Sequence, residues 1–105
     1  MTIRVVFMGT PGFALPTLAM LADRYDVVGV FTQRDKPAGR GQEIAVSPVK
    51  EFAQARGLPV YQPATLRRRE PVAELRALRP DLIVVAAFGL ILPQEVLDIP
   101  QHGCL

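Results

Sequence analysis

The sequence predicts an α/β fold, an open parallel sheet with helices on both faces. Two apolar runs, Ile3 to Met8 and Leu82 to Ala86, lack the polar alternation of a strand with one wet face, which is typical of parallel strands buried on both sides. Segments with helical apolar spacing alternate with the strands. The length of 105 residues allows one domain, and 50% of the residues are hydrophobic, enough for a small core.

The first strand, Ile3 to Met8, leads through a glycine turn into a helix whose apolar positions recur at i, i+3, i+4 and i+7. These positions are Leu15, Leu18, Ala19 and Ala22. Val27 to Phe31 is the expected second strand. A strand–helix–strand unit of this kind is a parallel crossover.

The turn after the first strand resembles a phosphate cradle but lacks its essential groups. Pro11 stands where the second glycine of G-x-G-x-x-G belongs, and proline offers no N–H to a pyrophosphate. Thr32 and Gln33 follow the second strand where an acid would bind a ribose, and Asp35 comes later. We therefore expect the turn to form a pocket wall without gripping phosphate. The wall residues are Gly9, Thr10, Pro11 and Phe13.

Residues 32–48 are far longer than an ordinary turn between a strand and its crossover helix. This segment carries glycines, Pro37 and the cations Arg34, Lys36 and Arg40. A loop of this length inside a compact domain is either functional or a solvated flexible insertion, and both alternatives stay open. Ser47 and Pro48 then form a helix start, with a capping hydroxyl followed by a proline at a helical φ.

The next helix has Val49, Phe52 and Ala53 on its inner face and stops at Gly57. Val60 and Tyr61 form a short third strand, suited to a sheet edge. The arginines at 67–69 precede a helix that begins near Glu70, and they indicate either a solvated surface or a nucleic-acid contact. The inward positions of that helix are Val72, Leu75 and Leu78, and it ends before Pro80.

The loop after Leu82 to Ala86 lies at the carboxyl end of a central strand, where open α/β sheets bind ligands. Its backbone groups are free of regular structure and could bind the edge of a flat heterocycle, while its apolar side chains pack on the faces. The alternative is that these are simply core residues. They are Phe88, Gly89, Leu90, Ile91 and Leu92.

Composition and the remaining residues argue against several classes of protein. The net charge of +2 does not by itself indicate nucleic acid, and no apolar run approaches the roughly 20 residues that span a bilayer. The single cysteine, Cys104, fits a reducing compartment, so we expect a soluble cytoplasmic protein with no membrane partner and no metal site. His102 has no acid or nucleophile beside it, which favours a loop or helix-end role over catalysis.

Five ordered segments resemble the amino-terminal part of the methionyl-tRNA formyltransferases, a family of folate-dependent formyltransferases. The likeness runs over essentially all 105 residues, and its most specific part is the Pro-Ala-Gly-Arg-Gly stretch at 37–41. The other segments are residues 7–14, 29–33, 47–50, 57–60 and 88–93, the 29–33 segment being counted together with 37–41.

The resemblance implies a Rossmann-like domain and transfer of a formyl group from 10-formyltetrahydrofolate to the amino group of methionine on initiator tRNA. It implies that the 88–92 loop lines the folate pocket through its backbone. It also implies that the long loop reaches the tRNA acceptor end. The tRNA-binding residues would be Lys36, Gly39, Arg40 and Gly41.

The family's catalytic Asn, His and Asp do not match residues of this chain. The Asn-x-His segment that carries two of them would begin after Leu105, so we expect no catalytic residue here, and the family's carboxyl-terminal β-barrel is likewise expected to be absent. The chain alone would then be inactive. Two alternatives stay open: another folate-dependent formyltransferase or hydrolase, and a non-catalytic nucleotide-binding module.

The expected strand order is third, second, first, fourth, with a further strand beside the fourth. Because Gly103, Cys104 and Leu105 resemble only the start of that strand, Leu82 to Ala86 would be an unprotected edge with unpaired N–H and C=O groups. We therefore expect the 105-residue chain to self-associate through Leu82 to Ala86.

Overall fold

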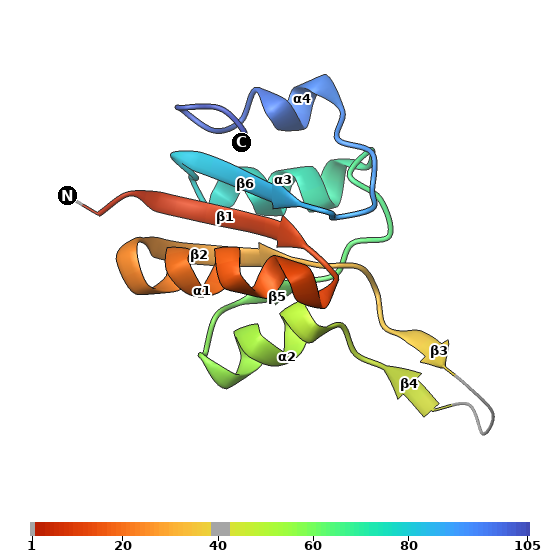
Figure 1. Ribbon diagram of the computed structural model, residues 1–105. Helices are drawn as coiled ribbons and strands as arrows, with labels where there is room; N and C mark the ends of the chain where they lie inside the picture. The colour runs from red at the N-terminus through yellow and green to blue at the C-terminus, as the bar shows by residue number, and fades with distance from the viewer. Residues whose placement is uncertain (1, 39–42) are drawn as a thin grey trace.

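The computed structural model describes residues 2–38 and 43–105, and it shows an open parallel sheet of four strands (Figure 1). The strand order is β5-β2-β1-β6, as predicted. The strands are β1 (Arg4–Gly9), β2 (Asp26–Phe31), β5 (Val60–Tyr61) and β6 (Leu82–Ala86). Each neighbouring pair is parallel, so the sheet switches direction of growth at β1.

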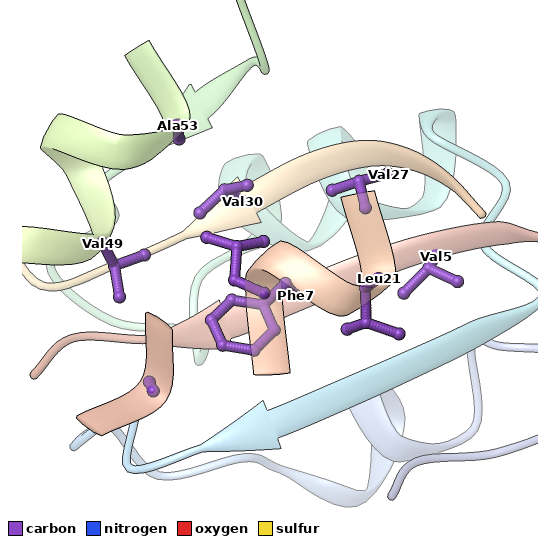
Figure 2. Close-up of a cluster of buried hydrophobic side chains, with 9 residues drawn as sticks. Val5, Phe7, Leu21, Val27, Val30, Val49 and Ala53 are labelled. Carbon is purple, nitrogen blue, oxygen red and sulfur yellow. The ribbon is translucent and has the colours of Figure 1, made fainter. Parts of the chain in front are cut away.

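Helices cover both faces of the sheet, and alternate residues of β1 supply the two cores. Val5 and Phe7 pack with the helices α1 (Leu15–Arg24) and α2 (Pro48–Ala55) (Figure 2). Val6 and Met8 face the opposite way, toward α3 (Arg69–Ala77) and α4 (Gln94–Leu97). All four β1 side chains are fully buried, which explains why this strand shows an unbroken apolar run.

The helix boundaries follow local chemistry. Ser47 caps α2, its hydroxyl oxygen accepting from the Lys50 N–H at 3.0 Å, as the sequence predicts. Gly57 adopts φ +71° just past the end of α2. A short 3-10 helix, η1 (Gly12–Ala14), precedes α1, and the predicted inner positions Leu18, Val72 and Leu75 are buried.

The long 32–48 segment contains two short strands. Its β3 (Lys36–Ala38) pairs antiparallel with β4 (Glu43–Ala45), in the register Lys36↔Ala45. The resulting β3–β4 hairpin extends away from the sheet (Figure 1). Strands of three residues are too short to show alternation, and Pro37 weakens the strand pattern further, so the sequence does not indicate this pairing.

The outer edge of β6 is partly paired, which corrects the expectation that its groups are all unpaired. Ile83 N–H donates to the Gly103 carbonyl at 3.2 Å, Leu105 N–H donates to the Ile83 carbonyl at 2.8 Å, and Val85 N–H donates to the Leu105 carbonyl at 2.9 Å. Residues 103–105 therefore lie beside β6 in the parallel direction, with a β-bridge between Ile83 and Cys104. Self-association through Leu82–Ala86 stays a prediction, but its premise is weakened at Ile83 and Val85.

Candidate functional site

Polar groups follow the carboxyl ends of three neighbouring strands. Thr10 follows β1, Thr32 and Gln33 follow β2, and Phe88 lies two residues after β6. Because β1 lies between β2 and β6, these residues meet at the carboxyl end of the sheet, where its strand order reverses. This edge is the position at which open α/β folds bind ligands.

The Phe88 carbonyl is the centre of this polar group. It accepts hydrogen bonds from Thr10 Oγ1 and from Gln33 Nε2, both at 3.1 Å. The Phe88 side chain is 2% exposed and packs in the core beneath. The start of the 88–92 loop is therefore fixed from both neighbouring strands.

The rest of the 88–92 loop offers uncommitted backbone. Within the described part of the chain, the backbone groups of residues 89–92 form no hydrogen bond. Gly89 adopts φ +90° and Ala87 φ +56°, so the chain turns sharply on either side of Phe88. Ile91 is 65% exposed, whereas a core residue would be covered. Of the loop's other apolar side chains, Leu90 and Leu92 are partly buried against the core, so the exposed surface of the loop combines Ile91 with backbone polar groups.

A shallow pocket of about 270 Å³ adjoins this loop. It is lined by Gln33, Arg34, Pro63, Ala64, Gly89 and Leu90. A larger hollow of about 740 Å³ lies near the opposite, amino end of β1 and β6, beside Arg4 and Asp81. In that hollow the Arg4 guanidinium already donates to the Leu78 carbonyl at 2.6 Å, so this cation is committed within the protein. The pocket beside the 88–92 loop, at the carboxyl end of the strands, is therefore the better candidate site.

The predicted wall residues of the first turn have separate roles. Gly9 allows close strand approach, since a Cβ there would lie 2.8 Å from the Ala86 carbonyl oxygen. Thr10 joins the polar group described above, Pro11 precedes η1, and the Phe13 side chain is 74% exposed. None of the four lines the 270 Å³ pocket.

The base of the β3–β4 hairpin is held by a partly buried ion pair that the sequence does not reveal. Asp35, directly before β3, accepts from Lys50 Nζ and from Gln62 Nε2, each at 2.8 Å. The Asp35 and Lys50 side chains are 27% and 15% exposed. The Lys50 hydrogen bond, followed by that of Gln62, lowers the pKa of the Asp35 carboxyl below its ordinary value. Asp35 therefore stays ionised at neutral pH.

A second contact holds the return end of the hairpin. Thr32 is fully buried, and its hydroxyl lies 2.8 Å from the Ser47 hydroxyl. Since Thr32 and Asp35 precede β3 and Ser47 follows β4, both ends of the hairpin are attached to the sheet and to α2. Of the predicted tRNA-binding residues, Lys36 begins β3, while Gly39, Arg40 and Gly41 lie outside the described residues.

Sequence analysis did not identify two glutamines of this site, although their positions in the chain could have indicated a role. Gln33 and Gln62 each stand just past the carboxyl end of a strand, at the edge where ligands bind. Their partners, however, lie far along the chain, and only the fold brings them together. Across the described residues, no cluster of three or more His, Cys, Asp or Glu is placed to hold a metal ion, and no helix is long and apolar enough to cross a membrane.

The sheet order, the helices on both faces and the loop site at the carboxyl edge define a Rossmann-like α/β domain. The formyl transferase family model matches residues 3–105, so the chain belongs to the formyl transferase family.

Two curated relatives are named methionyl-tRNA formyltransferase. The protein of Xylella fastidiosa strain M23 is 63% identical over 101 residues, which cover 96% of this chain. That of Ectopseudomonas mendocina is 57% identical over 105 residues and 99% of the chain. In both comparisons the chain spans only 33% of the relative's length.

Solved structures confirm the fold. A phosphoribosylglycinamide formyltransferase from Streptococcus pneumoniae superposes with a TM-score of 0.65 at 20% identity, covering 99% of this chain and 54% of the other. A glycinamide ribonucleotide transformylase from Symbiobacterium toebii gives a TM-score of 0.67 at 17% identity, covering 99% and 50%. At these identities the likeness concerns the architecture alone.

Proposed function

We propose that this chain is the amino-terminal part of a methionyl-tRNA formyltransferase. In this proposal the 88–92 loop holds 10-formyltetrahydrofolate, and the β3–β4 hairpin faces initiator methionyl-tRNA. The reaction breaks the bond between the formyl carbon and N10 of the folate. It forms a bond between that carbon and the methionine amino group; the amino group loses a proton and N10 gains one, which releases tetrahydrofolate. The setting would be translation initiation in the cytoplasm.

The observation that carries the proposal is the hydrogen bonding of the 88–92 loop backbone. Its first carbonyl is fixed by Thr10 and Gln33, and the backbone of residues 89–92 is uncommitted among the described residues. A pterin ring has hydrogen-bonding groups along its edge and flat faces. Such a ring suits uncommitted N–H and C=O groups flanked by Leu90, Ile91 and Leu92.

In this proposal the hairpin binds methionyl-tRNA, which accepts the formyl group. Arg40 is the main contact and Lys36 a lesser one. An arginine binds phosphate bidentately and stacks on bases, whereas a lysine acts as a point charge. Gly39 and Gly41 flank Arg40 and would let the backbone approach the acceptor end. Phe13, exposed on the same edge of the sheet, adds an apolar wall.

The groups that move protons and stabilise the oxyanion belong, in this proposal, to the part of the relatives that this chain does not span. The residues of this chain would bind and orient the two substrates. The relatives' remaining two thirds would complete the Rossmann-like domain and add the β-barrel. The chemistry can therefore be tested in a chimera, with this chain in place of the matching residues of the Xylella fastidiosa relative.

The test compares Arg40→Ala with the unchanged chimera. We expect transfer of the formyl group to methionyl initiator tRNA, and a fall of at least tenfold in kcat/KM for tRNA in Arg40→Ala, with tetrahydrofolate affinity unchanged. Equal losses of tRNA and folate affinity would refute the assignment of the hairpin. Formyl transfer to glycinamide ribonucleotide, or simple hydrolysis of the donor, would instead place the chain with another activity of the family.

A further inference from the structure

Asp35, Lys50 and Gln62 form a three-residue clamp at the base of the β3–β4 hairpin. The residues come from three separate places: the start of the hairpin, the first turn of α2 and the end of β5. Each Asp35 carboxylate oxygen has its own donor, Lys50 Nζ on one and Gln62 Nε2 on the other. The clamp therefore fixes both the position and the direction of the chain that enters β3.

Gln33 connects this clamp to the 88–92 loop. Its carbonyl accepts from Gln62 Nε2 at 3.1 Å, and its N–H donates to Thr10 Oγ1 at 3.2 Å. Its side-chain amide donates to the Phe88 carbonyl at 3.1 Å. The hairpin base and the 88–92 loop are thus held in one continuous hydrogen-bonded group.

We propose that Asp35, Lys50 and Gln62 are positioning residues that set the hairpin relative to the 88–92 loop, so that the amino group of the acceptor meets the formyl donor. This inference rests on the function proposed above. Two substrates on separate loops react efficiently only when the loops hold them in register, and a misplacement of about 1 Å can cost about a hundredfold in rate. The clamp supplies that register without touching either substrate.

Asp35→Asn tests the clamp because its electrostatic and positional effects on tRNA have opposite signs. Asparagine keeps the size of the side chain and can still accept from Gln62, but it no longer balances the Lys50 charge. Simple electrostatics predicts stronger tRNA binding, since a negative charge is removed and a cation is released near a polyanion. Loss of position predicts a weaker reaction instead.

Asp23→Asn is the matched control. Asp23 also forms an ion pair, with Arg56 at 3.3 Å, but its side chain is 66% exposed on α1, away from the carboxyl edge. In the chimera we expect Asp35→Asn to lower kcat/KM for methionyl-tRNA about tenfold or more, and Asp23→Asn to change it less than twofold. The tetrahydrofolate affinity should stay within about twofold in both variants, which also verifies folding.

A second variant separates positioning from direct contact by Lys50. If Lys50 bound a tRNA phosphate, Lys50→Met would reduce the slope of log(kcat/KM) against log[salt] by about one. A positioning role predicts a tenfold or larger loss at an unchanged slope, with partial recovery in Lys50→Arg.

The proposal is overturned if Asp35→Asn matches Asp23→Asn, if it improves tRNA use, or if Lys50→Met flattens the salt slope. These outcomes require a chimera that formylates tRNA. An unchanged chimera that fails to do so counts against the proposed function, and the two failures are therefore distinguishable.

Discussion

Gly89→Ala should destabilise the protein more than Gly57→Ala, although both glycines have positive φ. At Gly57, with φ +71°, a Cβ would have no atom within 4 Å, so alanine there meets only the left-handed backbone cost of about 1–2 kcal/mol. At Gly89, φ is +90° and a Cβ would lie 1.8 Å from Gln33 Nε2. The amide must therefore leave, and the Phe88 carbonyl loses one of its two donors.

The difference between the two variants measures the Gln33 contact. A hydrogen bond of this kind contributes about 0.5–1.5 kcal/mol net, so we expect Gly89→Ala to cost about 2–3 kcal/mol against about 1–2 for Gly57→Ala. In a Gln33→Ala background the clash is gone, and Gly89→Ala should cost about as much as Gly57→Ala. The cycle thus predicts a coupling of about 1 kcal/mol between Gly89 and Gln33.

Urea unfolding of the 105-residue chain, followed by far-ultraviolet circular dichroism, gives these free energies. Tetrahydrofolate titration of the chimera adds the functional readout, where Gly89→Ala should weaken binding and Gly57→Ala should not. Equal costs at the two glycines, or a Gly89→Ala cost unaffected by Gln33→Ala, would refute the packing of Gln33 against the 88–92 loop. Intact folate binding in Gly89→Ala would count against the pocket lying here.

Four further outcomes are expected. Lys36→Ala in the chimera should reduce tRNA use less than Arg40→Ala, with an effect that disappears at high salt, and a salt-independent loss would contradict a point-charge role. Leu90→Met should change tetrahydrofolate affinity less than about threefold, because the shape of the loop is kept. Gly29→Ala places a Cβ 2.7 Å from Leu78 Cδ1 and should cost about 1–3 kcal/mol in urea unfolding, whereas a neutral result would show that Leu78 moves freely. The Lys50 hydrogen bond, followed by that of Gln62, holds the pKa of Asp35 below its ordinary value, so its stabilising effect should be constant from about pH 5 to 8 and be lost only as the pH falls through that lowered pKa. A carboxyl NMR titration that shows the pKa of Asp35 at or above the ordinary aspartate value would contradict the clamp.

The sequence predicts the central strand β1 well because its side chains are buried on both faces, whereas in β6, for which the sequence predicts equal burial, only Ile83 is fully buried. Val5 to Met8 are fully buried, and that burial is what an unbroken apolar run records. The strand order and the helices on both faces follow from the crossover rule and are confirmed. The pairing of β3 with β4 is not predictable in the same way, since three-residue strands carry no periodic pattern.

The position of the candidate site is predictable from the sequence, but its polar supports are not. The 88–92 loop does lie at the carboxyl edge of the sheet, with Ile91 exposed as a binding loop requires. Its role, and that of Arg40, stay predictions. Asp35 and Gln62 are 27 positions apart in the sequence, and no local sequence pattern predicts a hydrogen bond between them. The pairing at the edge of β6 escapes prediction because residues 103–105 are too few to be recognised as a pairing segment.

Hydrogen–deuterium exchange of the chimera tests most directly whether the donor and acceptor sites lie where we propose. Tetrahydrofolate should slow exchange of the 89–92 amides, which are uncommitted among the described residues, and leave the hairpin unchanged. Initiator tRNA should slow exchange across residues 35–48 and leave the 89–92 amides unchanged. Protection by tetrahydrofolate at another edge of the sheet, or by tRNA away from the hairpin, would contradict the account.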